Sequence, residues 1–317
     1  MSTHGGVMMA RQSSSSKLVA ASGPTGWFKL RPRVWMLLLL LIALGVAAHF
    51  AWRHSAPVIA RHPQYLLTAE GIHITPPPPW IRSDIKMRVL RDAGLIGTVS
   101  LLDDWDSLAR RVKNAFEFHP WVASVERITK RPPTSLEIEL KYRRPLAAVE
   151  SGDANGVTFL PIDEQGVRLP EADLTDAERR YLPRISGVTG RPLVGDVWPD
   201  QRVIGGAKLV EALADTWRQL KLVEIIAAQR PPLNEAEPVY TFEMVTTGGT
   251  RIVWGAAPGQ ERSAGELSCD EKRKRLLDYS NQHGHLDSID GPASIDVRSD
   301  LLVTPRTARR KASAATK

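Results

Sequence analysis

The chain of 317 residues has a single cysteine, Cys269, so it can form no internal disulfide. It also lacks short motifs that mark common enzymes: a Gly-x-Ser-x-Gly nucleophile elbow, a Walker phosphate loop and a dinucleotide-binding glycine fingerprint. Two glycine pairs, Gly5-Gly6 and Gly205-Gly206, are not followed by the residues that a phosphate loop needs. Internal repeats and heptads are absent too. We therefore expect neither catalysis nor a cofactor or metal, and we interpret Cys269 as a bystander.

The formal net charge of +7 is concentrated in the two ends of the sequence. Residues 1–33 carry five cations and no acid, residues 305–317 carry five more cations, and the remaining residues are net negative at −3. A protein that binds a nucleic-acid duplex needs a basic stripe on its folded part. The charge distribution therefore argues against a nucleic-acid partner, and we expect both basic ends to be disordered.

A long apolar run at residues 34–52 contains no residue of fixed charge and has Trp35 and Trp52 near its ends. At about 1.5 Å per residue, a helix of this length spans roughly 28 Å, close to the thickness of the hydrocarbon core of a bilayer. A cleaved signal peptide is the main alternative, but its apolar core is shorter and no clear Ala-x-Ala site follows. Because the cations precede the run, we predict a retained anchor with a cytoplasmic amino terminus. Residues 53–64, broken by Pro57 and Pro63, are expected to be an extended linker.

Residues 65–142 predict a small α+β domain. A strand is expected over residues 66–74, a short helix from Ser83 or Asp84, and a second helix from Asp103 or Asp104 to Phe118, where Pro120 stops it. The second helix repeats apolar residues at three- and four-residue steps, which predicts one buried face. Two strands separated by a Pro-rich turn at residues 131–134 complete a hairpin, and residues 136–140 alternate apolar and charged side chains.

Residues 143–304 predict a second domain with a mixed, mainly antiparallel sheet and two helices. The expected helices cover residues 206–220 and 270–281. The expected strands cover residues 146–149, 158–162, 223–227, 239–245, 251–254 and 294–298, the last continuing through 304. A closing strand of this kind tends to lie at a sheet edge, where its backbone can pair with another chain.

The order strand, helix, helix, strand, strand, with His119-Pro120-Trp121-Val122 after the second helix and Arg144-Pro145 at the exit, resembles the POTRA domain of the FtsQ/DivIB cell-division proteins. The likeness continues into the second domain. There, Leu182-Pro183-Arg184-Ile185-Ser186-Gly187 matches an LP-x-I-x-G element, and Asp296-Val297-Arg298 is similar to a closing D-[LV]-R. One departure is Ser299, which stands where an aromatic residue is common in the family.

This resemblance implies a non-enzymatic, single-pass scaffold of the bacterial divisome in the plasma membrane at the division site. Its bulk would lie outside the cytoplasm, where it would link other single-pass division proteins at the septum. The implied partners are FtsB- and FtsL-like coiled-coil proteins. The implied receiving edge for the FtsB-like partner is Arg298, Leu301, Leu302, Val303 and Thr304. The implied segments are a cytoplasmic tail (1–33), a transmembrane helix (34–52), a linker (53–64), a POTRA-like domain (65–142), a β domain (143–304) and a basic tail (305–317).

Two other hypotheses remain open. An exported POTRA-bearing protein of envelope transport would need a carboxy-terminal barrel of alternating strands, and the sequence shows none. A membrane-anchored cell-wall hydrolase would have to use the cluster His283, His285, Asp287 and Asp290, whose spacing fits no zinc signature. The four cations at residues 272–275 are interpreted as a solvated helix face, with contact to an acidic partner as the alternative.

Overall fold

The computed structural model describes residues 32–60, 65–97, 100, 104–131, 135–153, 156–230, 239–284, 286, 288 and 291–306. Most of the two predicted tails therefore lies outside the described residues. The chain divides into two units, residues 1–59 and residues 60–317.

The first unit contains the apolar helix α1, Pro32–Ala60. Its segment Val34–Ser55 has a mean hydropathy of 2.4 and no buried residue, and it is long and apolar enough to cross a membrane. The helix continues beyond the apolar run, so residues 53–60 are not the extended linker predicted above. Pro57 removes one backbone hydrogen bond without ending the helix, which continues to Ala60.

Residues 65–142 form an α+β subdomain in the predicted order. The strands β1 (Ile72–Ile74), β3 (Ser135–Tyr142) and β2 (Val122–Arg131) lie side by side, with β1 parallel and β2 antiparallel to β3. The helices α2 (Ile85–Asp92) and α3 (Trp105–Glu117) bury one face each in the same core as the sheet. Both helix starts are as predicted, since Asp84 and Asp104 accept hydrogen bonds from backbone N–H groups of the first turn. The first strand is shorter than the expected 66–74.

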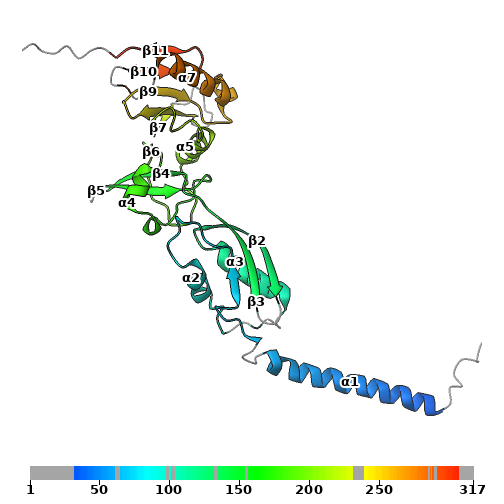
Figure 1. Ribbon diagram of the computed structural model, residues 1–317. Coiled ribbons are helices and arrows are strands. Elements are labelled where there is room, and N and C mark those ends of the chain that lie inside the picture. The colour runs from blue at the N-terminus through cyan, green and yellow to red at the C-terminus, as the bar shows by residue number, and fades with distance from the viewer. Residues whose placement is uncertain are drawn as a thin grey trace, which may run out of the picture. The chain divides into compact units, whose positions relative to one another are not determined.

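Residues 143–306 are built on an eight-stranded mixed sheet. Its order is β11-β10-β9-β8-β7-β6-β4-β5, with four antiparallel and three parallel ladders. In Figure 1 the colour along this sheet runs from green at β4 and β5 to red at β11. The strands are β4 (Ala147–Asp153), β5 (Gly156–Ile162), β6 (Arg184–Ser186), β7 (Leu222–Arg230), β8 (Val239–Thr246), β9 (Arg251–Gly255), β10 (Ser294–Asp296) and β11 (Leu302–Thr304).

Two longer helices, α5 (Gln201–Ala212) and α7 (Cys269–His283), bury apolar residues in the core of this sheet. The predicted helix 206–220 is wrong at both ends, because Asp200 caps α5 earlier and the chain turns after Ala212. The pair Gly205-Gly206 has a packing role. A Cβ added at Gly205 would lie 2.6 Å from the ring of Phe242, so the absence of a side chain allows α5 to approach the sheet closely. Two shorter helices complete the set, α4 (Asp176–Tyr181) and α6 (Glu261–Ala264).

The two subdomains of residues 60–317 are joined through Asp173, which is 5% exposed and lies in the 3-10 helix η2, Glu171–Asp173. Its carboxylate accepts four hydrogen bonds from the first subdomain: from the backbone N–H groups of Arg82 (3.2 Å) and Ser83 (2.7 Å), from the Ser83 hydroxyl (2.9 Å) and from Trp121 Nε1 (2.6 Å). One side chain therefore satisfies a set of donors that belong to the other subdomain.

Replacing Asp173 by alanine is expected to lower the free energy of unfolding by roughly 3 kcal/mol, because several partly buried donors lose their acceptor at once. Chemical denaturation of the full-length protein in detergent, followed by tryptophan fluorescence, measures this loss. The matched control is Asp215→Ala at an exposed position, which should unfold at the wild-type denaturant concentration. Unchanged unfolding of Asp173→Ala would contradict the junction described here.

Candidate functional site

The strand β11 lies at one end of the eight-stranded sheet and is paired on one side only. Its partners are in β10, with Ser294 opposite Thr304, Ile295 opposite Val303 and Asp296 opposite Leu302. The predicted continuous strand 294–304 is thus two short antiparallel strands, because the chain leaves the sheet after Asp296 and returns at Leu302. The described residues place no strand on the outer side of β11. Its outward N–H and C=O groups are available for pairing with another chain.

The side chains on this edge are unusually apolar for an exposed strand. Leu302 is 63% exposed, Val303 38%, and Leu301 just before the strand 38%. The opposite edge of the sheet differs, since β5 contains Pro161, and Ile162 forms a bridge to Arg168. Proline and a covering segment are two ways in which proteins protect an edge from pairing. The last residues of β5 are therefore protected from pairing, whereas the described residues show no such protection on β11.

Two cavities lie beside α7, one next to β11 and the other next to the connection that precedes β11. One, of about 410 Å³, is lined by Tyr279, His283 and Val303 among others, and the second, of about 400 Å³, is lined by Arg275, Tyr279 and Leu301 among others. The Arg275 guanidinium also donates to the Ser299 carbonyl in the connection that precedes β11. The edge strand and the exposed side of α7 together form a surface that offers both backbone pairing and side-chain grooves.

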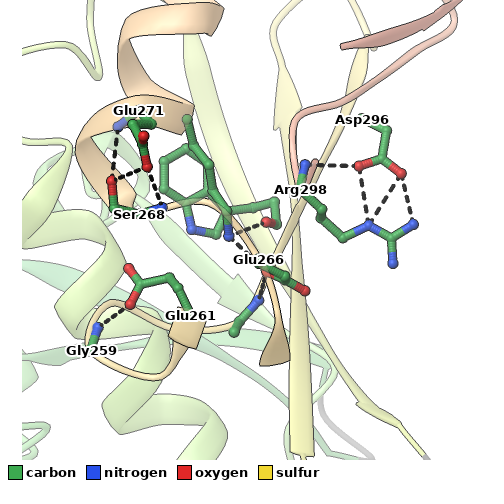
Figure 2. Close-up of polar contacts among 10 residues, drawn as sticks. Gly259, Glu261, Glu266, Ser268, Glu271, Asp296 and Arg298 are labelled. Carbon is green, nitrogen blue, oxygen red and sulfur yellow. Dashed lines mark hydrogen bonds and ion pairs between the residues drawn. The ribbon is translucent and has the colours of Figure 1, made fainter. Parts of the chain in front are cut away.

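A buried ion pair links α7 to the sheet next to this surface. Lys272 of α7 is fully buried, and its Nζ lies 2.7 Å from Glu266 Oε2, donates to the Trp254 carbonyl at 2.9 Å and lies 5.3 Å from the Trp254 ring centre. The Glu266 carboxylate also accepts from the Ala256 backbone N–H at 2.8 Å. Figure 2 shows Glu266 at the centre of these contacts, beside the pair of Asp296 and Arg298. The pair ties α7 to the end of β9, the strand next to β10.

The connection between β10 and β11 is held by Arg298. Its guanidinium forms a two-pronged pair with Asp296 at 2.7 to 3.1 Å, and its carbonyl accepts from the Leu267 N–H at 2.9 Å. Burial alone would raise the pKa of Asp296, but the hydrogen bonds and charge of Arg298 outweigh it and hold that pKa below its usual range. At neutral pH the Asp296 carboxylate and the Arg298 guanidinium are therefore both charged. Their pairing stabilises the connection between β10 and β11.

The residues predicted to receive a partner fall into two groups. Leu302, Val303 and Thr304 form β11, and Leu301 directly precedes it. Arg298 lies outside the strand and is engaged with Asp296 and Leu267, so it positions the turn and is not part of the edge.

The predicted POTRA motif residues lie in and near the first core. Trp121 and Val122 are fully buried or nearly so, whereas Arg144 is exposed and Pro145 is half-buried. His119 is 7% exposed, and its Nδ1 accepts from the Trp121 N–H at 3.3 Å. Burial, and next the charge of Arg88, lower the pKa of His119, so the ring is neutral at pH 7. Pro120 ends the helical stretch before β2. The buried residues of this motif pack within the first subdomain, and none of the six motif residues is part of β11.

Sequence reasoning missed two buried charged contacts, Asp173 with its donors and Lys272 with Glu266. The prediction that residues 272–275 form a solvated face is wrong for Lys272. A usable signal was present, since Lys272, Leu276 and Ser280 follow one another at four-residue steps and all three are buried on α7.

The His283 to Asp290 cluster lies only partly within the described residues. His283 stacks on Tyr279 with ring centres 4.3 Å apart, while His285, Asp287 and Asp290 lie outside the described residues. Among the residues that the structure describes, no group of three metal-ligating side chains comes together. Cys269 is half-buried at the start of α7, and burial raises the pKa of its thiol.

No protein-family model matches the chain, and no curated protein is significantly similar to it in sequence.

Proposed function

We propose that this protein is a non-enzymatic, membrane-anchored scaffold that captures a strand of another protein on the open edge β11. The observation that carries the proposal is the combination of an apolar, exposed edge strand with two cavities beside α7, one next to the strand and one next to the connection before it. A partner strand would gain backbone hydrogen bonds along β11, and an adjoining helix or loop would bury apolar side chains beside Tyr279 and Leu301.

The FtsQ/DivIB resemblance gives this scaffold its biological setting. The order of elements over residues 65–142 is the order expected of a POTRA domain, and the closing Asp296-Val297-Arg298 delivers the edge strand. We propose a role in the bacterial divisome, with an FtsB-like protein on β11 and an FtsL-like protein in the same complex. In this role the chain makes and breaks no bonds, and it places septal wall synthases by binding the proteins that recruit them.

The proposed topology follows from α1 and the charges that precede it. The 22-residue segment Val34–Ser55 is long and apolar enough to cross a bilayer, and five cations with no acid lie before it. The amino terminus would remain in the cytoplasm, and both subdomains would lie on the other side of the membrane. The single cysteine suits that oxidising side, because no internal pairing is possible.

Co-purification of the full-length protein from its native membranes tests the proposal. The wild type is compared with a chain that ends after Arg298 and lacks β11, and with a control that ends after Arg306 and keeps it. Mass spectrometry is expected to find short, single-pass coiled-coil proteins with the wild type and the control, and to lose them with the shorter chain. Equal recovery from the shorter chain would exclude β11 as the site. Absence of such proteins from every sample would refute the division role.

A further inference from the structure

A second surface lies far along the sheet from β11, where three parallel strands begin. The strands β4, β6 and β7 run in the same direction, so Leu146, Arg184 and Leu222 meet at one end of the sheet. A groove of about 770 Å³ opens there, and we call it the basic groove. Its lining includes the cations Arg144, Arg180, Arg184, Arg218 and Lys221.

The lining of this groove is positively charged. Five of its lining residues are cations and none is acidic, although the chain between the two tails is net negative. Arg184 reaches Glu224 at 4.0 Å. The other four cations are exposed and form no ion pair with any acid in the described part of the chain. Unpaired like charges brought together from separate segments repel one another, so this arrangement favours an anionic ligand.

The backbone at Lys221 gives an independent indication. Lys221 has a φ of 54° and is the one non-glycine residue with a positive φ among the described residues. It occupies the left-handed position of a Schellman turn, in which the Leu222 N–H donates to the Trp217 carbonyl and the Lys221 N–H donates to the Arg218 carbonyl. Glycine is the usual residue there, because a side chain is strained in this conformation. The position carries a lysine at some cost to stability, and its side chain lines the groove.

Apolar side chains between the cations indicate what kind of anion fits. Leu146, Leu182 and Trp217 line the same groove, and Tyr181 at its rim is 88% exposed. A bare phosphate or a lipid headgroup needs only the cations, whereas a peptide that carries carboxylates and apolar side chains uses both kinds of surface. All three strands at the groove already have neighbours on both sides, so the ligand would bind through side chains and not by strand addition.

We propose that the basic groove binds an acidic peptide segment of a partner protein, with apolar residues of that segment packed between the cations. This site is separate from the edge strand β11 and does not depend on the proposed role of that edge. Each exposed cation is expected to contribute a small, salt-sensitive amount to the affinity, and together they would select against basic segments such as the tails of this chain.

Fluorescence anisotropy with the full-length protein in nonionic detergent tests the groove. The probe is a fluorescein-labelled peptide rich in glutamate with interspersed leucines, and its glutamine counterpart is the peptide control. Lys221→Gly removes one charge and relieves the strained backbone, so it should weaken binding by about 3-fold while the thermal midpoint stays the same or rises. The triple variant Arg144→Gln, Arg218→Gln, Lys221→Gly should weaken it by roughly 30-fold. Lys274→Gln, an exposed lysine on α7 outside the groove, is the matched control and should bind as the wild type does.

The other outcomes are equally decisive. If the wild type fails to bind the acidic probe, or if the triple variant binds it as well as Lys274→Gln does, the groove does not bind acidic peptides. Vesicles with and without anionic phospholipid are run in parallel. If the triple substitution abolishes binding to anionic vesicles but leaves peptide binding unchanged, the ligand is a lipid headgroup and the proposal is wrong.

Discussion

Replacing Val303 by proline is expected to reduce capture of the proposed FtsB-like partner by roughly 100-fold. Val303 is the central residue of β11 and lies opposite Ile295. Proline has no N–H group, and its ring interferes with a neighbouring strand, so the incoming strand would lose several backbone bonds worth about 1 kcal/mol each. Pull-down from native membranes with quantitative mass spectrometry, followed by titration with the identified partner, measures the loss.

Two further variants give this prediction its controls. Leu302→Lys keeps every backbone donor but places a charge on the edge, and it should also weaken capture, because charged side chains are a common protection of edge strands. Val157→Pro introduces the same residue on the opposite edge, in β5, where the valine is 59% exposed. It should leave capture unchanged. If Val157→Pro and Val303→Pro reduce capture equally, the effect comes from general destabilisation, and the assignment of β11 fails.

Replacing Lys272 by methionine is expected to lower the free energy of unfolding by about 3 to 5 kcal/mol. Glu266 has a side-chain exposure of 7% and would remain buried without its positive partner, while the Trp254 carbonyl would lose a donor. Breaking one side of a buried pair costs more than the pair contributes when intact, because the remaining charge has no solvent to stabilise it. Thermal and chemical denaturation of the full-length protein in detergent measure the change.

The double variant Lys272→Met, Glu266→Gln separates the two possible causes. If the cost comes from the unpaired carboxylate, neutralising Glu266 should restore a large part of the lost stability. Lys274→Met on the same helix is the matched control, and it should change the stability by less than about 0.5 kcal/mol because Lys274 is exposed. A Lys272→Met protein as stable as this control would show that the buried contact is not a support of the fold.

The elements of the first subdomain could be predicted because the residues that define each helix and strand lie close together in the sequence. Asp84 and Asp104 cap helices whose apolar residues repeat regularly, and a Pro-rich turn separates two strands of clear alternation, so bounds and faces follow from neighbouring residues. The second subdomain depends more on contacts between distant residues. Nothing near Ser294 shows that the chain leaves the sheet after Asp296, because that break depends on the pairing of Arg298 with Asp296 and Leu267.

The candidate site was predictable in position but not in construction. The sequence placed the edge near Leu302 and Val303, because they belong to the last predicted strand and a closing strand tends to lie at a sheet edge. The burial of Lys272 was not recognised, although its four-residue spacing to Leu276 places both residues on one face of α7. The groove around Lys221 was not expected at all, since its cations come from separate segments of the chain that only the parallel pairing of β4, β6 and β7 brings together.

The edge strand β11 can pair with one further strand at a time, because its other side is occupied by β10. Pro161 and the bridge of Ile162 to Arg168 protect the last residues of the opposite edge strand, β5. Pairing of β11 with β11 of a second copy would give a closed two-fold dimer in which both acceptor positions are consumed. Self-association through this edge and capture of a partner are therefore mutually exclusive, and the ratio of the two proteins sets which one forms.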